Sequence, residues 1–299
     1  MTPVYLSGIE YVHGDRRDIA ELAGQLDPEL LGPDSGLSCY RASDLDIWEL
    51  AAHAGAQTLK AAAEPPDLVI YITENDHVAS DSLNRLVRSL GLPDARYVRG
   101  SGHDCGNVGP ALSLARQALA GGEHRQALIL LADKVIDGDR SQANKLSVVS
   151  DGAAACLVTA EPPGANGVQF AVNGISTVTD TDAASDPADG GRILATVALA
   201  AAGAAQIAGQ TGREAKAFDH LLFPNYRVVA QQFLCSALSV PLEKLLFGPM
   251  AEFGHCFSAD SLVSLAHCAD FDEIRPGEHV LAFGDGQYSW SSLAIQRLG

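Results

Sequence analysis

The chain has 299 residues, of which 47% are hydrophobic and 19% are charged, and its formal net charge at pH 7 is −17. This length and composition predict a globular protein with a large core, in one large domain or two ordinary ones. The negative charge would repel nucleic acid and anionic membranes at long range, so we expect neither as a partner.

The N-terminal sequence MTPVYLSGIE lacks a basic segment followed by an apolar one, so we expect no secretory signal and a cytoplasmic location. The most apolar stretch, residues 193–209, is rich in Ala and Gly, contains Gln206 and is shorter than a membrane span, which predicts a buried helix. The cysteines at positions 39, 105, 156, 235, 256 and 268 form no C-x-x-C pair. Disulfides and a metal site are therefore not expected.

Several short apolar runs predict strands that are buried on both faces. They are residues 68–73, 127–132, 153–160, 221–223, 280–283 and 292–296. Helical patterns lie between them, and the clearest covers residues 106–121, where apolar side chains recur on one stripe and two glycines follow. This alternation predicts an α/β protein with packed sheets and covering helices.

The order of elements in the first half of the chain is repeated in the second. A strand LVIYIT, a helix headed by Cys105 and the strands ALILLAD and AAACLVT are echoed by HLLFPN, a helix headed by Gly254 and His255, HVLAFGD and SSLAIQR. A duplicated αβ unit accounts for this order, with a seam in residues 161–191, which are rich in Pro, Gly and Asp. We therefore predict an N-terminal half, residues 1–165, and a C-terminal half, residues 166–299.

Cys105 is the first candidate for chemistry. It follows the polar loop Gly100-Ser101-Gly102-His103-Asp104 and precedes the helix of residues 106–121, so its sulfur is expected at a helix N-terminus. The partial positive charge there favours thiolate over thiol. The competing interpretation is an inert packed cysteine, since free cysteines are among the most buried residues.

Three segments carry a resemblance to a known family. The run DCGNVGPALSLARQALAGGEHRQALILLAD resembles the nucleophile region of β-ketoacyl-ACP synthase III, a branch of the thiolase superfamily, and SVVSDGAAACLVTA is similar to its F-G-D-G-A-G-A segment. The C-terminal runs AEFGHCFSADSLVSLAHC and EIRPGEHVLAFGDGQYSW resemble its G-N-T-S-S-A-S helix, its K-P-G-D turn and its last glycine-rich strand. The resemblance implies a thiolase-like five-layered αβαβα fold with two pseudo-symmetric halves, a homodimer and no permanently bound cofactor.

The departures from the family concern its catalytic residues. In condensing members, the His of an H-Q-A-N motif and a second Asn hold the malonyl thioester carbonyl during decarboxylation. The first His position here is Pro224 and the last position of the motif is Arg227, although a shift of two residues would place Asn225 there. The second Asn position is His255. Decarboxylative condensation needs two neutral donors at the developing enolate, and Pro224 provides none.

Acyl transfer needs a thiolate, a base, an orienter for the base and an oxyanion hole. Asp260 lies five residues after His255, close enough for its carboxylate to reach the imidazole. We therefore predict a catalytic triad of Cys105, His255 and Asp260, with His103 as a reserve base. By analogy with the family, the oxyanion hole is expected to use the N–H groups of Cys105 and Gly286. The alternative is that His255 only packs and that Asp260 is a solvated helix charge.

The resemblance implies a function in which Cys105 takes an acyl group from the phosphopantetheine thioester of an acyl carrier protein, or from acyl-CoA. The group then passes to a hydroxyl, amine or thiol of a small acceptor, as in a branch of the family that serves antibiotic biosynthesis. The helix predicted for residues 228–238 carries no Lys or Arg for docking an acidic carrier, which leaves Arg227, Lys216 and Arg213 as candidates. Two alternatives remain: a carbon–carbon condensing synthase, and a non-catalytic subunit of a heterodimeric synthase.

Overall fold

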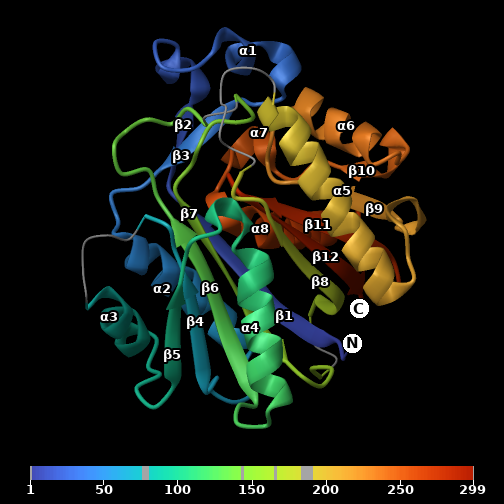
Figure 1. Ribbon diagram of the computed structural model, residues 1–299. Helices are drawn as coiled ribbons and strands as arrows, with labels where there is room; N and C mark the ends of the chain where they lie inside the picture. The colour runs from blue at the N-terminus through green and yellow to red at the C-terminus, as the bar shows by residue number, and fades with distance from the viewer. Residues whose placement is uncertain (1, 76–80, 143–144, 165–166, 183–190, 299) are drawn as a thin grey trace.

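The computed structural model describes residues 2–75, 81–142, 145–164, 167–182 and 191–298. Its main feature is a mixed sheet of ten strands in the order β10-β9-β11-β12-β8-β1-β7-β6-β4-β5 (Figure 1). The strands are β1 Val4–His13, β4 Leu68–Ile72, β5 Arg96–Gly100, β6 Gln126–Asp133, β7 Gly152–Thr159, β8 Gln169–Thr179, β9 His220–Leu222, β10 Leu245–Leu246, β11 His279–Asp285 and β12 Ser289–Arg297. A separate pair consists of β2 (Asp15–Asp18) and β3 (Cys39–Ala42).

The sheet consists of two halves with the same topology. The first half has the order β1-β7-β6-β4-β5, and the second has the order β8-β12-β11-β9-β10. Strand directions also agree. The second strand in each of these orders, β7 or β12, runs antiparallel to both of its neighbours within the half, and the other neighbouring pairs are parallel. The predicted duplication is thus confirmed. The boundary predicted between residues 165 and 166 lies outside the described residues.

The halves are joined edge to edge by antiparallel pairing of Val4–Ser7 in β1 with residues 169–172 in β8. The helices then form three layers around the two halves of the sheet. They are α1 Pro28–Leu31, α2 Ile47–Thr58, α3 Ser82–Ser89, α4 Val108–Ala120, α5 Gly191–Thr211, α6 Val228–Ala237, α7 Met250–Phe253 and α8 Asp260–Asp270. α2 and α3 pack on the outer face of the first half, α5 and α6 pack on that of the second, and α4 and α8 lie between the halves.

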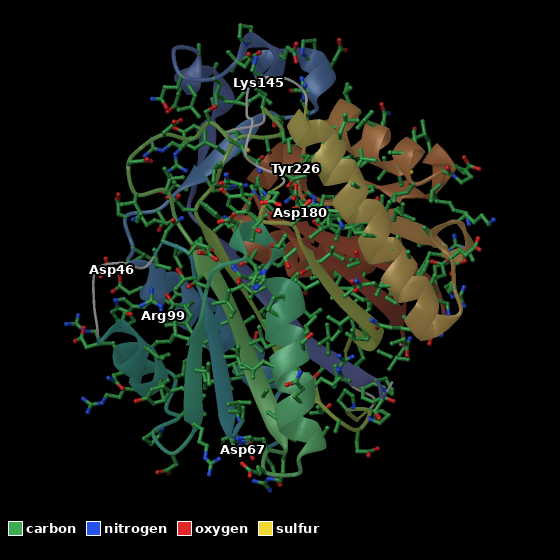
Figure 2. All side chains as sticks on the ribbon, viewed as in Figure 1. Asp46, Asp67, Arg99, Lys145, Asp180 and Tyr226 are labelled. Atoms are coloured by element: carbon green, nitrogen blue, oxygen red, sulfur yellow. The ribbon has the colours of Figure 1, made fainter. Side chains whose placement is uncertain are left out.

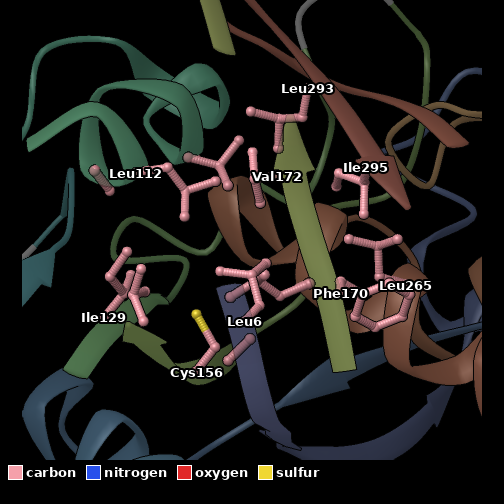
Figure 3. Packing of buried hydrophobic residues seen from close by; sticks show 14 of the residues in the cluster. Leu6, Leu112, Ile129, Cys156, Phe170, Val172, Leu265, Leu293 and Ile295 are labelled. Carbon is pink, nitrogen blue, oxygen red and sulfur yellow. The ribbon is translucent and has the colours of Figure 1, made fainter. Parts of the chain in front are cut away.

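Alternation along the strands produces these layers, since successive side chains point to opposite faces. In β6, Ile129 faces the central helices while Leu128 faces α2, and in β11, Val280 faces inward while Leu281 faces the α5 and α6 side. The central core contains Leu112 of α4 and Leu265 of α8, together with strand residues of both halves such as Cys156 and Leu293 (Figure 3). The predicted five-layered αβαβα arrangement is confirmed.

The predicted strands and the helix of residues 106–121 are present, with ends shifted by at most three residues. One expectation was wrong: residues 193–209 belong to α5, which covers the second half instead of being buried. Leu199, Ala204 and Ile207 face the sheet, whereas Leu194 is 72% exposed. In the described part of the chain, no helix is both long and apolar enough to cross a bilayer.

The central helix α4 approaches the sheet closely at Gly109. A Cβ atom at this position would lie 2.3 Å from Ser291 Oγ and 2.6 Å from Thr177 Oγ1. Ser291 Oγ in turn donates a hydrogen bond to the Gly106 carbonyl at 2.5 Å, next to Cys105. The absence of a side chain at Gly109 therefore sets the distance between the nucleophile segment and the second half.

We predict that Gly109→Ala destabilises the protein by about 1–3 kcal/mol, because the added methyl forces α4 away from β12. Alanine favours helices over glycine by about 1 kcal/mol, so intrinsic helix propensity alone predicts the opposite sign. Chemical denaturation measures the difference. Gly121→Ala is the control, since a Cβ there meets its nearest atom at 3.6 Å; equal effects of the two substitutions would contradict the packing argument.

Candidate active site

Cys105 lies in a tight turn between β5 and α4. The turn, Asp104–Gly106, is a single 3-10 turn in which Asp104 has a φ of +47°. Glu74, just after β4, holds it by accepting several hydrogen bonds on one carboxylate oxygen. The donors are the N–H groups of Gly102 (2.5 Å), His103 (3.1 Å) and Asp104 (3.0 Å) and the side-chain amide of Asn107 (2.5 Å).

The second half of the molecule holds the same turn from the other side. The hairpin between β11 and β12 contributes the Gln287 N–H, which donates to Asp104 Oδ2 at 2.9 Å, and the Ser289 hydroxyl, which donates to the His103 carbonyl at 3.1 Å. The His103 side chain makes no hydrogen bond through its buried Nδ1 among the described residues. His103 thus shapes the loop through its backbone, and the geometry adds nothing to its candidacy as a second base.

His255 is positioned by a short extended segment and not, as expected, at the head of a helix. Its N–H donates to the Val148 carbonyl at 2.8 Å, and its own carbonyl accepts from Ser150 N–H at 2.9 Å. The preceding Gly254 has a φ of +61°, and a Cβ there would lie 2.8 Å from both Ser150 Oγ and Val148 O. Only glycine fits this close approach, so the sequence Gly254-His255 turns the imidazole toward the first half of the chain.

Asp260, the first residue of α8, is 1% exposed and fully hydrogen-bonded. It accepts from the N–H groups of Cys256 (2.7 Å) and Asn225 (2.8 Å), from the Asn225 side chain (3.2 Å) and from His255 Nδ1 at 2.5 Å. The Ser264 hydroxyl donates to the Asn225 side-chain oxygen at 3.2 Å and so fixes that amide. Asn225, which the two-residue shift brings onto the motif, therefore orients the carboxylate together with the Cys256 N–H.

The three predicted triad residues lie next to one another in the order Cys105, His255, Asp260. His255 Nε2 lies 3.0 Å from Cys105 Sγ, and His255 is 1% exposed. Since Nδ1 faces a carboxylate, it carries the proton of the neutral ring, and Nε2 is left as an acceptor facing the thiol. The structure thus has the connectivity of a nucleophile, a base and an orienter. Asp260 is not the solvated helix charge of the alternative interpretation.

The sequence predicts that Cys105 favours the thiolate, whereas its burial in the structure favours the thiol. Burial raises the pKa of the Cys105 thiol, and the nearby His255 lowers it only in part. For His255, burial disfavours the charged ring, but the negative groups of Cys105 and Asp260 outweigh burial and raise its pKa well above the ordinary value. Cys105 and His255 thus share one proton: burial favours the neutral thiol, whereas the Asp260 carboxylate favours the protonated imidazole. The proton can therefore pass between Sγ and Nε2 across the 3.0 Å contact.

The two predicted oxyanion donors differ in availability. The Cys105 N–H makes no hydrogen bond within the described part of the chain. The Gly286 N–H, by contrast, donates to the Ser289 carbonyl at 2.8 Å and closes the β11–β12 hairpin. Gly286 lies beside Cys105 in the same cavity, but its N–H is already engaged, which leaves Cys105 as the better-placed donor.

Sequence reasoning missed one buried pair beside the triad. Tyr226, labelled in Figure 2, donates its hydroxyl to Asp285 Oδ2 at 2.8 Å, and its ring centre lies 5.5 Å from that of His255. Burial and the Asp285 carboxylate raise the pKa of Tyr226 well above its ordinary value. The hydrogen bond joins residues 59 positions apart. No local motif links them, although Tyr226 adjoins the H-Q-A-N position and Asp285 adjoins Gly286.

A cavity of about 230 Å³ opens onto Cys105. Its lining is polar and comes from both halves of the chain. The lining residues are Glu74, Asn75, Asp104, Cys105, Gln142, Thr196, Phe257, Asp285, Gly286 and Gln287. The cavity therefore reaches Cys105, which is a partly exposed residue, whereas His255 and Asp260 are buried.

No family model and no curated protein matches this sequence. Solved structures match it over nearly the whole length. An acyltransferase, ChlB3, has a TM-score of 0.84 and 18% identity, with 99% of this chain and 98% of that chain covered. The 3-oxoacyl-(acyl carrier protein) synthase III, FabH, of Pseudomonas aeruginosa PAO1 has a TM-score of 0.83 and 20% identity, with 99% of this chain and 98% of that chain covered.

A third structure, OleA of Xanthomonas campestris with bound lauric acid and lauroyl-CoA, has a TM-score of 0.80 and 15% identity over 98% of both chains. The three proteins share a fold with this chain, and the first two are an acyltransferase and a synthase. The chain therefore has the thiolase-like fold of the β-ketoacyl-ACP synthase III group.

Asp133, at the end of β6, supports the segment that carries Glu74. Its Oδ1 accepts from Thr73 Oγ1 (3.0 Å) and from the N–H groups of Glu74 (2.8 Å) and Asn75 (3.1 Å). Its Oδ2 has no partner among the described residues. Burial raises the pKa of Asp133 from 3.8 to about 7. The folded protein therefore binds this proton more tightly than the unfolded chain does.

The contribution of Asp133 to stability is greatest below pH 4 and is lost as the pH rises through its folded pKa of about 7. We predict that Asp133→Asn, which keeps the Oδ1 acceptor and removes the charge, raises the free energy of unfolding above pH 7 and flattens its fall between about pH 4 and 7. Denaturation at several pH values measures this. The exposed Asp137→Asn serves as control, and an unchanged slope in Asp133→Asn would contradict the assignment.

Proposed function

We propose that the protein is an acyltransferase that carries an acyl group on Cys105. The observation that carries the proposal is the hydrogen-bonded series from Cys105 Sγ through His255 to the buried Asp260 carboxylate, at 3.0 and 2.5 Å. A thiol, a base and an orienter in this order are the parts that acyl transfer requires. The accessible cavity above Cys105 provides room for donor and acceptor in turn.

In the first half-reaction, His255 Nε2 takes the Cys105 proton as the sulfur attacks the thioester carbonyl. The negative charge develops on the carbonyl oxygen, toward which the Cys105 N–H is the available donor. The carbon–sulfur bond of the donor then breaks, and the leaving thiolate takes the proton from His255. Asp260 stabilises the imidazolium that exists between these two proton transfers.

In the second half-reaction, an acceptor hydroxyl, amine or thiol occupies the cavity. His255 takes its proton as it attacks the carbonyl of acyl-Cys105. The bond between the carbonyl carbon and Sγ breaks, and His255 returns the proton to Sγ. The enzyme is thereby restored, and the acceptor has become an ester, amide or thioester.

The site fits transfer better than carbon–carbon condensation. Condensation needs two neutral donors at the enolate oxygen. Pro224, at the first position of the motif, is buried and has no side-chain donor, and His255 presents an acceptor nitrogen to the sulfur. The likeness to FabH and OleA keeps condensation as the second candidate, while the assembled triad argues against a non-catalytic subunit.

We propose that the acyl donor is an acyl carrier protein thioester or an acyl-CoA. A small uncharged acyl thioester can replace this donor in an assay. The cations that the sequence offers for carrier docking already have partners. Arg227 pairs with Glu29 at 2.6 Å, and Lys216 pairs with Glu214 at 2.9 Å. The α6 surface instead exposes Val229 and Phe233, at 53% and 48%. A carrier would therefore have to dock here through apolar contacts.

We further propose a homodimer that acts in the cytoplasm, in a pathway of secondary metabolism such as antibiotic biosynthesis. Support for the dimer comes from β5, which forms one edge of the ten-stranded sheet. Its side chains Tyr97 and Val98 are 45% and 40% exposed, and an open strand edge of this kind offers its backbone to a second chain.

We predict that Cys105→Ala abolishes formation of a covalent acyl-enzyme from an acyl thioester, because no other thiol faces the base. Cys256→Ala is the matched control: this thiol is buried, burial raises its pKa well above the ordinary value, and it should not carry the acyl group. Intact-protein mass spectrometry measures the adduct. Normal adduct formation by Cys105→Ala would exclude Cys105 as the nucleophile.

We predict that His255→Ala slows both the acylation of Cys105 and the transfer to the acceptor, because the same imidazole takes the proton of the thiol in the first step and of the acceptor in the second. A positioned general base contributes a factor of roughly 10² to 10⁴, and a thioester donor has a good leaving group. Asp260→Asn should show a smaller defect of the same kind, since it releases the imidazole from its orientation. Rapid quenching followed by mass spectrometry separates the two half-reactions.

The same enzyme preparations decide between transfer and condensation. Wild-type protein incubated with a malonyl thioester should release little carbon dioxide. Efficient malonyl decarboxylation that disappears in His255→Ala would favour the condensing enzyme over the acyltransferase.

A further inference from the structure

The backbone around Cys105 keeps one N–H group free while its neighbours are engaged. Glu74 Oε1 accepts the N–H groups of residues 102, 103 and 104 at 2.5, 3.1 and 3.0 Å. The N–H groups of residues 106 and 107 donate to the carbonyls of residues 103 and 104 at 2.8 and 3.3 Å. Between residues 102 and 107, all of them described, the Cys105 N–H is the one backbone donor without an acceptor in the protein. It is therefore available to a group bound in the cavity that Cys105 lines.

The direction of this free N–H is set by the carbonyl on the other side of the same peptide bond. The Asp104 carbonyl and the Cys105 N–H belong to one planar group and point in opposite directions. That carbonyl accepts Asn107 Nδ2 at 2.6 Å and the Asn107 N–H at 3.3 Å. A rotation of the Cys105 N–H would break both of these hydrogen bonds.

Asn107 is itself held by Glu74. Its Nδ2, which donates to the Asp104 carbonyl, also donates to Glu74 Oε1 at 2.5 Å, and Asn107 is 1% exposed. Glu74 thus acts on this peptide group twice, through the side chain of Asn107 and through the three N–H groups that precede Cys105. Such a convergence of successive N–H groups on one oxygen is a backbone arrangement that binds anions.

Glu74 has a buried support of its own. Its N–H and that of Asn75 donate to Asp133 Oδ1 at 2.8 and 3.1 Å, and Asp133 is 1% exposed. The Glu74 carboxylate is therefore fixed at its backbone and at Oε1. The contacts run without interruption from β6 to the peptide group of the nucleophile.

We propose that Glu74 is a positioning residue for acyl transfer, which holds the Cys105 N–H in the direction that the oxyanion of the attacked thioester requires. This inference rests on the proposed function. A donor that is aimed in advance at the developing negative charge needs no reorganisation during the reaction. Glu74 acts through Asn107 and the preceding backbone, and this role needs no contact with the reacting atoms.

The charge of Glu74 has the opposite effect on the reaction. A carboxylate near Cys105 disfavours both the thiolate and the oxyanion, so electrostatics alone predicts that its removal speeds acylation. A positioning role predicts slower acylation. The sign of the change therefore separates the two effects.

The test compares two reactions of the Cys105 sulfur. Acylation by a butyryl thioester of N-acetylcysteamine passes through an oxyanion, whereas alkylation by iodoacetamide is a displacement at a saturated carbon and forms none. Both reactions need the same sulfur and the same base. Glu74→Ala should slow acylation about tenfold, less than the factor of roughly 10² to 10³ that follows removal of an oxyanion donor itself. The rate of alkylation should not fall.

A second variant and a matched control complete the test. Glu74→Gln keeps an oxygen acceptor but weakens its hydrogen bonds by removing the charge. It should slow acylation by a smaller factor, and it decides the question if Glu74→Ala does not fold. Glu64→Gln removes an equal charge from an exposed ion pair with Arg125 and should change neither rate. Intact-protein mass spectrometry measures both adducts, with Cys105→Ala as the background from other thiols.

The two proposals fail in different ways. If the wild-type protein forms no acyl-Cys105, the acyltransferase proposal itself is wrong. If the wild-type protein is acylated but the folded Glu74 variants react with the thioester at the wild-type rate or faster, only the positioning inference is overturned. It is also overturned if these variants lose acylation and alkylation in equal proportion, because Glu74 would then act on the sulfur and not on the oxyanion donor.

Discussion

The active site depends on one buried charge, the carboxylate of Asp260. A buried carboxylate is costly unless its oxygens are hydrogen-bonded, and here the backbone of Cys256, the backbone and side chain of Asn225, and the His255 ring supply the donors. These contacts fix both the direction and the tautomer of His255. The distance of 3.0 Å from Nε2 to the sulfur follows from that orientation, because Asp260 and Cys105 are the only side chains that hydrogen-bond to the imidazole in the described structure.

The fold brings these groups together because each half supplies one central helix. Cys105 precedes α4 of the first half, and Asp260 begins α8 of the second. Both helices lie between the same two halves of the sheet, so their N-terminal ends meet. Gly109 permits the close approach of α4 to β12, and Gly254 turns His255 toward the sulfur. The site is thus a consequence of the duplication and of two positions without side chains.

The sequence predicts those parts of the molecule whose signals are local. β4 and β6 are continuous apolar runs because both faces of these strands are covered, and Gly121–Gly122 follow the end of α4. β1 and β8 escape prediction because polar residues such as Glu10 and Asn173 interrupt them. Longer-range features are also invisible: the extended backbone at His255 depends on pairing with Val148 and Ser150, and the Gly286 N–H is taken by a hairpin bond. Burial likewise raises the pKa of Cys105, against the effect expected from a helix N-terminus alone.

The placement of the base also bears on which reaction the site can support. A histidine that aids enolate formation must point an N–H at the carbonyl oxygen while it is neutral. His255 points its Nδ1 at Asp260, so in the proposed mechanism its Nε2 receives a proton from Cys105 or from the acceptor before it donates one. That sequence of events suits the passage of a proton from an attacking thiol or hydroxyl to a leaving sulfur, and it does not suit the steady support of an enolate. The loss of a donor at Pro224 and the gain of an oriented base at His255 therefore favour the same chemistry.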